Sequence, residues 1–439
     1  MGKKFISFFF CLLLILVFCS LGVSQMDASK KIDDLYSQIE IFSYALTTIQ
    51  SEYVDEKKPQ ELIYGSLTGM LSALDPHSQF LTPEDYQELK TETQGKFGGL
   101  GIEISIKDGL LTIISPIEDT PAWRAGLMAG DIIVKIEDEI TKNMSLSDAV
   151  KRLRGEPEAP VTITVLREKE FKFQEYTIVR EIIQIQDIKD TQILEDKIGY
   201  IRLTEFREDT HKDFLKAIEN LRTQEANALI LDLRNNPGGL LNVAIDITDE
   251  FLSPGEMIVS TKGRRPSQNM ESKATNKGRE IDWPIVVLIN EGSASGSEIL
   301  AGALKDNKRA IIVGQQSFGK GSVQSVIPLP DGSGLRLTTS KYFTPSGVSI
   351  HGTGITPDVL VERIYDKPEE TEEIIKEKEK EINKIFDDVE INESDEPEKL
   401  QQDKKDMSAR QILLDDNQIQ AAISIIKGIR VYKNFGQAG

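Results

Sequence analysis

The sequence predicts a multidomain α/β protein with helical segments at its N- and C-termini. Three observations support this fold class. The chain has 439 residues, which is too long for one hydrophobic core. Its apolar residues change from helical spacing to strand-like alternation near Gly95. From about residue 183 to residue 363, continuous apolar runs alternate with amphipathic stretches, as in an α/β core.

The composition is typical of a soluble, acidic globular protein. Hydrophobic residues make up 39% of the chain and charged residues 28%, and the formal net charge is -19. Such a charge repels phosphate backbones and anionic headgroups, so the composition argues against nucleic acid or an anionic membrane surface as the main partner. It does not identify a substrate.

Residues 1–25 have the pattern of a secretory signal. Two lysines precede an apolar run from Phe5 to Phe18, and small residues follow. The run is short for a membrane-spanning helix. We expect export across the inner membrane to the periplasm or another extracytoplasmic space, with this segment either cleaved or kept as an anchor. Cys11 and Cys19 both lie in it, so the mature chain would have no disulfide or thiolate site.

Two units are expected before the core. In the N-terminal helical region, residues 26–92, leucines recur at helical spacing, and Thr82 is placed to cap a helix. In the next unit, residues 93–182, isoleucines alternate with polar residues from Ile102, and Ser145 is placed to cap a helix with an apolar face.

The predicted core, residues 183–365, contains apolar runs that fit strands buried on both faces. Residues 366–410 are rich in Glu, Lys and Asp and are expected to form a solvated linker. Residues 411–439 contain an amphipathic helix whose apolar face must be buried, either on the core or on a second subunit. A homodimer through the N- and C-terminal helices is therefore an expected assembly.

Residues 290–299 read Asn-Glu-Gly-Ser-Ala-Ser-Gly-Ser-Glu-Ile and carry the first candidate for chemistry. A buried strand ends just before them and a helix begins near Gly296, so Ser295 lies on the turn. The N–H groups and the positive dipole end of the helix suit an oxyanion generated there. The alternative is that Ser293 or Ser295 only caps the helix.

Lys320 lies between two glycines and near the apolar residues Phe318 and Val323. A desolvated lysine can lose its proton near neutral pH and serve as the base that a serine nucleophile needs. Gln324 follows at the spacing of a helical turn, so its amide oxygen could orient the amine. The alternative is a solvated loop lysine.

The chain has three histidines, which could form a competing histidine-based triad. His77 falls in the N-terminal helical region and His211 begins a helix, which leaves His351 as the candidate in the core. No HExxH or comparable pair is present, so the sequence predicts no metal site.

A glycine-containing loop follows the buried strand that ends at Asp232. Glycine allows backbone N–H groups to approach a substrate closely. Gly238 or Gly239 could therefore donate one hydrogen bond to an oxyanion, and Gly296 could donate the other. The phosphate-binding patterns GxGxxG and GxxxxGKS/T are absent.

Together and in this order, these stretches resemble the carboxyl-terminal processing proteases, or tail-specific proteases, of the Ser/Lys peptidase family S41. The resemblance covers nearly all of the chain after the signal segment. The matching stretches are Tyr53-Val-Asp, Leu74-Asp-Pro-His-Ser, Phe97-Gly-Gly-Leu-Gly-Ile, Leu231-Asp-Leu-Arg-Asn-Asn-Pro-Gly-Gly, Ser293-Ala-Ser-Gly-Ser-Glu-Ile, Gly302-Ala-Leu-Lys-Asp, Phe318-Gly-Lys-Gly-Ser-Val-Gln and Tyr342-Phe-Thr-Pro-Ser-Gly.

The resemblance implies roles for individual residues and a ClpP/crotonase-like core without metal or cofactor. The nucleophile falls on Ser295, the general base on Lys320 and the lysine-orienting residue on Gln324. Supporting positions fall on Glu298, Asp306 and Ser317, and for Asp306 a purely structural role is an equal alternative.

The resemblance also identifies residues 93–182 as a PDZ domain, a partly open β-barrel with helices. The Gly99-Leu100-Gly101-Ile102 loop would bind a C-terminal carboxylate, and the strand with Ile104 would pair with the peptide. Arg154, after the helix that forms the other wall, could couple peptide binding to activity. The alternative is a PDZ domain that packs on the core and binds nothing.

The predicted activity is hydrolysis of peptide bonds near the C-terminus of protein substrates held by their C-terminal tails. Neutral Lys320 would accept the proton of Ser295, which attacks the carbonyl and forms an acyl-enzyme. Two alternatives remain. One is a peptide-binding scaffold with an inert core, and the other is an amidase or esterase for small molecules, in which the PDZ domain would have no purpose.

Overall fold

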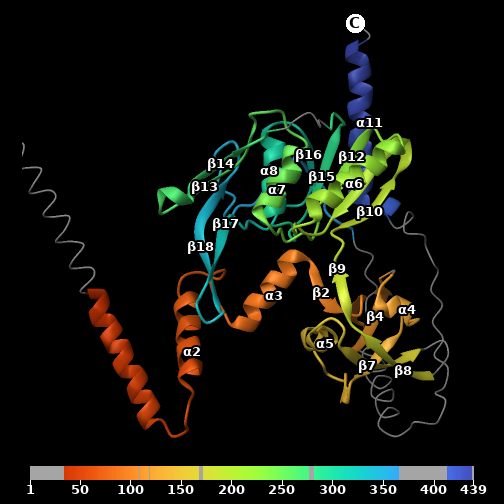
Figure 1. Ribbon diagram of the computed structural model, residues 1–439. Coiled ribbons are helices and arrows are strands. Elements are labelled where there is room, and N and C mark those ends of the chain that lie inside the picture. Colours follow the sequence, from red (N-terminus) through yellow and green to blue (C-terminus); the bar gives the residue numbers. More distant parts are fainter. Residues whose placement is uncertain are drawn as a thin grey trace, which may run out of the picture.

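The computed structural model describes residues 34–107, 109–117, 119–167, 172–275, 281–364 and 413–437. The predicted signal segment (1–25) and linker (366–410) lie outside these residues. No helix within the described ranges is both long and apolar enough to cross a bilayer. Figure 1 shows a smaller β-rich unit and a larger α/β core joined by a two-stranded ribbon.

The N-terminal region contains a helix over residues 34–52, followed by α2 (Pro59–Ser72), β1 (Gln79–Leu81) and α3 (Pro83–Gln94). The predicted cap is confirmed, because Asp85 N–H donates to Thr82 Oγ1 at 3.2 Å and the Asp85 side chain accepts from Thr82. β1 pairs antiparallel with a strand of the core, so this region also supplies part of a sheet.

The β-rich unit has its own sheet, in the order β3-β4-β5-β7-β8 with β6 paired to β5. Its hydrophobic cluster includes Ile113, Ile133 and Ile163, all fully buried. The cap predicted at Ser145 is confirmed by a 3.1 Å bond from Asp148 N–H. The elements are β3 (Ile102–Lys107), β4 (Leu110–Pro116), α4 (Pro121–Arg124), β5 (Ile132–Ile136), β6 (Glu139–Ile140), α5 (Leu146–Leu153), β7 (Pro160–Arg167) and β8 (Lys172–Val179).

A ribbon of β2 (Lys96–Gly99) and β9 (Glu181–Gln184) connects this unit to the core, and its strands pair antiparallel. β2 leads into the unit and β9 leads out, so both chain crossings between the two units pass through the ribbon (Figure 1).

The core is built on a six-stranded sheet in which all neighbours except β10 and β11 are parallel. Parallel neighbours require crossover helices, which explains the strand–helix alternation in the sequence. In sheet order, the strands are β10 (Ile188–Ile193), β11 (Ile198–Leu203), β12 (Ala228–Asp232), β15 (Ile285–Ile289), β16 (Ile311–Gly314) and β19 (Val359–Leu360).

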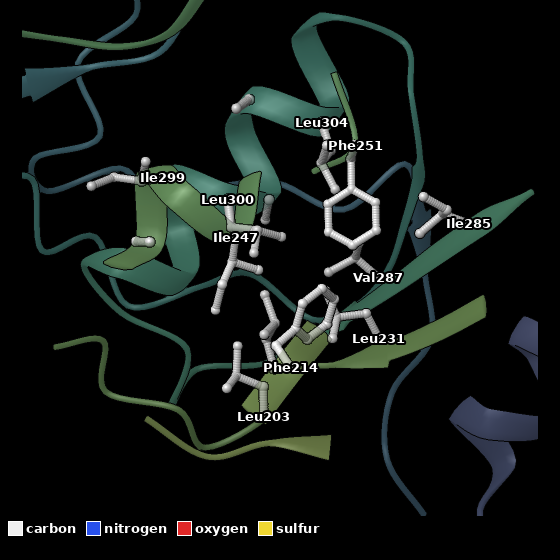
Figure 2. Packing of buried hydrophobic residues seen from close by; sticks show 14 of the residues in the cluster. Leu203, Phe214, Leu231, Ile247, Phe251, Ile285, Val287, Ile299, Leu300 and Leu304 are labelled. Carbon is white, nitrogen blue, oxygen red and sulfur yellow. The ribbon is translucent and has the colours of Figure 1, made fainter. Parts of the chain in front are cut away.

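Helices cover both faces of this sheet. Alternate strand residues such as Leu231 and Val287 face α6 (Thr210–Thr223), α7 (Leu241–Asp249) and α8 (Gly296–Asp306), and Figure 2 shows this packing. The intervening residues, such as Ile230, face α11 (Asn417–Gln437). The apolar face of α11 is therefore buried on the core, which answers the alternative left open by the sequence.

A second sheet lies beside α8, and the loop that contains Lys320 leads into one of its strands. Its order is β1-β18-β13-β14, and β17 pairs with β18. The helical-turn spacing inferred for Lys320 and Gln324 is wrong, because Gln324 lies in a strand of this sheet. The strands are β13 (Met257–Gly263), β14 (Met270–Lys273), β17 (Ser322–Pro328) and β18 (Gly334–Phe343), and short 3-10 helices are η1 (Glu195–Lys197) and η2 (Pro266–Gln268).

Candidate active site

Three loops meet at the carboxyl edge of the parallel sheet. The oxyanion loop (residues 233–240) follows β12, the nucleophile turn (290–295) follows β15, and the lysine loop (315–321) follows β16. These strands are adjacent and parallel, so their carboxyl ends lie side by side. Open α/β sheets place their reactive groups at this edge.

Ser295 occupies the sharp turn into α8. Its backbone has φ 51° and ψ -108°, a conformation that is costly for a residue with a side chain. Such strain persists only where the surrounding structure holds it, and here it places the residue at the helix N-terminus with 8% of its surface exposed. The turn therefore keeps Ser295 at the helix N-terminus instead of adopting a relaxed backbone conformation.

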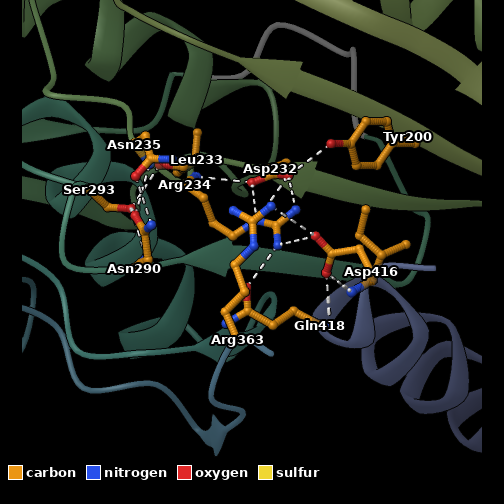
Figure 3. A network of polar contacts seen from close by, with 11 residues as sticks. Tyr200, Asp232, Leu233, Arg234, Asn235, Asn290, Ser293, Arg363, Asp416 and Gln418 are labelled. Atoms are coloured by element: carbon orange, nitrogen blue, oxygen red, sulfur yellow. Dashed lines mark hydrogen bonds and ion pairs between the residues drawn. The ribbon is translucent and has the colours of Figure 1, made fainter. Parts of the chain in front are cut away.

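The other serine of the turn has a structural role. Ser293 Oγ donates to Leu233 O at 2.8 Å and accepts from Asn290 N–H at 3.0 Å, and the residue is fully buried. Asn290 Oδ1 accepts from Asn235 N–H, and its amide donates to Asn235 Oδ1, both at 2.8 Å (Figure 3). These bonds join the nucleophile turn to the oxyanion loop.

Gly238 packs directly against Ser295. A methyl group on it would lie 2.7 Å from Ser295 Cβ, so no side chain fits there. Its N–H donates to Asn236 Oδ1 at 2.9 Å. Among the described residues, Gly239 N–H and Gly296 N–H have no intramolecular acceptor. Of the two candidate loop donors, the geometry thus favours Gly239.

Glu298 connects the nucleophile turn to the lysine loop. Its fully buried carboxylate accepts from Ser295 N–H at 2.8 Å and from Lys320 N–H at 2.9 Å through the same oxygen. The other oxygen accepts from Ser317 Oγ at 2.5 Å and from Gly319 N–H at 2.7 Å. Burial raises the pKa of Glu298, and these four donors oppose that shift.

Lys320 is half-buried. Burial lowers the pKa of its amine, Arg336 lowers it further, and Glu298 opposes both. No hydrogen bond joins Lys320 Nζ to Ser295 Oγ in the described part of the chain. Burial lowers the pKa of His77, and the positive charge of Lys320 lowers it further.

Gln324 does not contact Lys320 through a hydrogen bond within the described ranges. Its amide donates to Ser322 Oγ at 2.8 Å and reaches Thr338 Oγ1 at 3.5 Å. Thr338 N–H in turn donates to Ser78 Oγ at 3.1 Å, and its hydroxyl donates to Asp75 at 3.2 Å. The Asp75-Pro-His-Ser stretch therefore holds β18, the strand that pairs with the strand of Gln324.

Tyr342 is a residue of the site to which the sequence analysis gave no role. It is 4% exposed, and its N–H donates to Gly321 O at 2.8 Å, next to Lys320. Burial raises the pKa of its hydroxyl, and the Ser295 hydroxyl opposes this. In the sequence, the only signal for this residue was the Tyr342-Phe-Thr-Pro-Ser-Gly stretch. Its place in the site depends on the pairing of its strand, β18, with strands that are distant in the sequence.

The two remaining supporting residues differ. Ser317 Oγ accepts from Ile355 N–H at 2.7 Å in addition to its bond with Glu298, so it fixes the start of the lysine loop. Asp306 is the last residue of α8 and accepts from Ser346 N–H at 2.9 Å. It holds a loop at the end of the helix remote from Ser295, which fits the structural alternative.

The β-rich unit has a groove between β3 and α5. Its cavity of about 80 Å³ is lined by Leu100, Ile102 and Ile104 on one side and by Val150 and Leu153 on the other. Gly99, Gly101, Phe97 and Arg154 complete the lining. The Arg154 guanidinium lies 4.2 Å from the centre of the Phe97 ring, and Phe97 belongs to the ribbon.

A buried ionic network lies behind the oxyanion loop and was also missed. Arg234 Nη1 donates to Asp416 at 2.7 Å and to Gln418 at 2.8 Å, and its Nε and Nη2 contact Asp232 (Figure 3). Tyr200 donates to Asp232 at 2.8 Å. Charged residues inside the apolar run Leu231-Asp-Leu-Arg were the available signal, since such residues are buried only when paired.

Comparison with known proteins agrees with this architecture. Residues 197–361 match the model of peptidase family S41, and residues 112–167 match that of a PDZ domain. A carboxy-terminal-processing protease of Bartonella bacilliformis is 44% identical over 78% of this chain and 79% of that protein. A carboxyl-terminal-processing protease of Synechocystis sp. is 40% identical over 72% of this chain and 75% of that protein.

Among solved structures, the photosystem II D1 C-terminal processing protease is 30% identical, with a TM-score of 0.42, over 73% of this chain and 92% of that chain. The sequence relatives match over most of their own length and over most of this one. The chain therefore belongs to peptidase family S41, among the carboxyl-terminal processing proteases, and contains a PDZ domain.

Proposed function

We propose that the protein is a serine endopeptidase that cleaves protein substrates near their C-termini through an acyl-enzyme on Ser295. Lys320 accepts the hydroxyl proton and later gives it to the leaving amine. The N–H groups of Gly239 and Gly296 bind the oxyanion. The core that supports these groups is of the ClpP/crotonase-like type.

The shared carboxylate of Glu298 carries the proposal. One oxygen accepts the backbone N–H of both Ser295 and Lys320, so two loops that are 25 residues apart by their numbers share one anchor. The bond from Ser295 N–H also belongs to a capping box at the start of α8, so the distinguishing contacts are those from Gly319 N–H and Lys320 N–H, which a solvated loop lysine would not need. Burial and Arg336 lower the pKa of Lys320, which favours the neutral amine that a base requires.

The PDZ groove supplies the substrate preference. Its small apolar cavity suits an apolar C-terminal side chain, and β3 offers an edge for pairing with an extended tail. Arg154 then couples occupancy of the groove to the core, because its cation–π contact is with a residue of the ribbon. Unchanged activity and unchanged stimulation by peptides in Arg154→Ala would refute this coupling.

The test of the mechanism uses the variants Ser295→Ala and Lys320→Arg with an unfolded protein that has an apolar tail. Mass spectrometry of the products should show cleavage near the C-terminus by the wild type alone. Arginine keeps the positive charge but stays protonated, so Lys320→Arg should fold and be inactive. Wild-type turnover by Lys320→Arg would refute the base assignment, and no cleavage by any form would favour a scaffold.

Export and assembly complete the proposal. Residues 1–25, outside the described residues, direct the chain to an extracytoplasmic space and are cleaved or kept as an anchor, which N-terminal sequencing of the protein from fractionated cells distinguishes.

The helix over residues 34–52 leaves Leu35, Tyr36 and Tyr44 at least 60% exposed, whereas the apolar face of α11 is buried. We therefore propose that any homodimer forms through the former helix, which Tyr36→Glu should weaken in sedimentation experiments.

A further inference from the structure

We propose that helix α11, through Asp416 and Gln418, holds the oxyanion loop in its catalytic position, so that the C-terminal segment is part of the peptidase machinery. The inference rests on the proposed peptidase function. It extends that function because the family match ends at residue 361 and α11 lies beyond it.

Arg234 is the link between the helix and the loop. It is the second residue of the oxyanion loop and is 6% exposed. One terminal nitrogen of its guanidinium contacts Asp416 and Gln418, and the other nitrogens contact Asp232 at 2.6–3.1 Å. The backbone N–H of Arg234 donates to the same Asp232 carboxylate at 3.0 Å. The side-chain contacts therefore constrain the path of the loop backbone where it leaves β12.

The α11 residues of this link, Asp416 and Gln418, are themselves held in place. Asp416 also caps α11, because its other oxygen accepts from Gln418 N–H at 2.9 Å and from Ile419 N–H at 3.1 Å. The Gln418 amide donates to Val361 O at 2.7 Å. Ile419, together with three further apolar residues of the helix, is buried against the sheet. The position of the carboxylate is thus set by the whole helix.

The loop is fixed from two opposite directions. On the side of the nucleophile turn, Asn236 O accepts from Ala294 N–H at 3.0 Å and from Ser297 Oγ at 2.9 Å. Asn236 also bonds Leu203 O and Gly238 N–H, so it transmits its position to the glycines. On the other side, the described contacts to α11 come through Arg234. Loss of the α11 contacts would let the loop shift relative to Ser295, and a shift of a fraction of an ångström is enough to weaken an oxyanion hydrogen bond.

The charged groups around Arg234 determine which substitution can test its contact with α11. Arg234 faces two carboxylates, Asp232 and Asp416, and Arg363 lies 3.9 Å from the second one. Asp416→Asn removes one charge and leaves Arg234 paired with Asp232, so the guanidinium stays neutralised and the variant should fold. Replacing Arg234 itself would leave buried carboxylates without a partner, which is far more damaging to folding.

The experiment compares full-length Asp416→Asn and the double variant Asp416→Asn/Gln418→Met with a matched control. The control is Lys427→Ala, because Lys427 also joins α11 to the core, through Glu195 at 3.1 Å and Asp196 at 3.2 Å, but does not reach the loop. We expect kcat to fall about tenfold in Asp416→Asn and further in the double variant, with KM for a tailed substrate unchanged. Lys427→Ala should keep the wild-type kcat.

A second measurement separates positioning from folding. Addition of Ser295 Oγ to a peptide aldehyde gives a tetrahedral hemiacetal whose oxygen occupies the oxyanion site, so its affinity should fall in parallel with kcat. Affinity for an uncleaved tailed peptide should stay the same. Wild-type kcat in both Asp416 variants, or a fall that only matches the unfolded fraction seen by circular dichroism, would overturn the inference. An inactive wild type would instead overturn the proposed function, so the two failures are distinct.

Discussion

At the scale of single residues, the site is organised by groups that hold backbone rather than substrate. Glu298 accepts hydrogen bonds from four donors, and Asn290 accepts one from the oxyanion loop. The strained turn at Ser295 is therefore held on both sides. Strain of this kind costs about 1–3 kcal/mol and persists only where its surroundings over-determine it.

Gly238 provides a direct test of this close packing. Gly238→Ala should abolish detectable turnover, because its methyl group would meet Ser295 Cβ at 2.7 Å. Gly255→Ala is the matched control, since Gly255 has a similarly positive φ of 91° but no atom within 4 Å of the added methyl. The control should lose about 1–3 kcal/mol of stability and keep its kcat. Equal loss of activity in both variants would show that backbone strain, not the contact, is responsible.

Arg336 adds to the effect of burial on the pH range of activity in this site. A base must be neutral, so kcat/KM should rise as pH increases through the pKa of Lys320, which burial and Arg336 hold below its usual 10.5. Removing the positive charge in Arg336→Ala lets that pKa rise, and the acid limb of the kcat/KM profile should move to higher pH. Arg336→Lys, which keeps the charge, should leave the limb in place. An unshifted limb in Arg336→Ala would contradict the assignment of this limb to Lys320.

At the scale of elements, the sequence predicted what is locally encoded. The buried runs became β12 and β15, Thr82 and Ser145 cap their helices, and the turn before Gly296 opens α8. These features depend on neighbours in the chain. The predicted membership in family S41 is confirmed by relatives, which also depends on sequence alone.

What the sequence could not supply depends on pairing between distant segments. The helical spacing expected for Gln324 is wrong because this residue lies in a strand. That strand forms by pairing with β18, which comes later in the chain. The pairing of β1 with β18 and the contact of Asp416 with Arg234 join segments more than 180 residues apart. Such contacts leave no periodic signal in either segment, so pattern analysis does not detect them.

The groove of the PDZ domain gives a prediction for an element. Val150→Trp should fill the cavity of about 80 Å³ between α5 and β3. KM for a protein with an apolar tail should rise about tenfold, which corresponds to about 1.4 kcal/mol of lost binding. Turnover of a short peptide without a PDZ-binding tail should not change. Lys151→Trp adds the same side chain at the neighbouring exposed position and should behave as wild type.

At the scale of the whole molecule, the chain has separate hydrophobic cores. Among the described residues, two clusters lie within the PDZ domain, the larger of which contains Ile163, and two others lie on the opposite faces of the peptidase sheet. The ribbon of β2 and β9 carries both backbone connections between the two domains. Domains with independent cores and a narrow connection unfold as separate units.

Calorimetry should therefore show two transitions. Ile163 is fully buried in the PDZ cluster, and Ile163→Ala should lower the stability of that domain by roughly 3 kcal/mol. The transition of the peptidase core should keep its midpoint. A single transition, shifted as a whole by this variant, would show that the ribbon makes the two domains one cooperative unit.

The place of α11 in the chain has a consequence for how the enzyme comes into being. This helix covers β12, β15 and β16 on one face of the six-stranded sheet, yet every other described element precedes it. During synthesis, Ser295 and Lys320 therefore emerge from the ribosome before the helix that covers Ile230 and Val286. A nascent chain would contain both residues while this side of the sheet is still exposed to solvent.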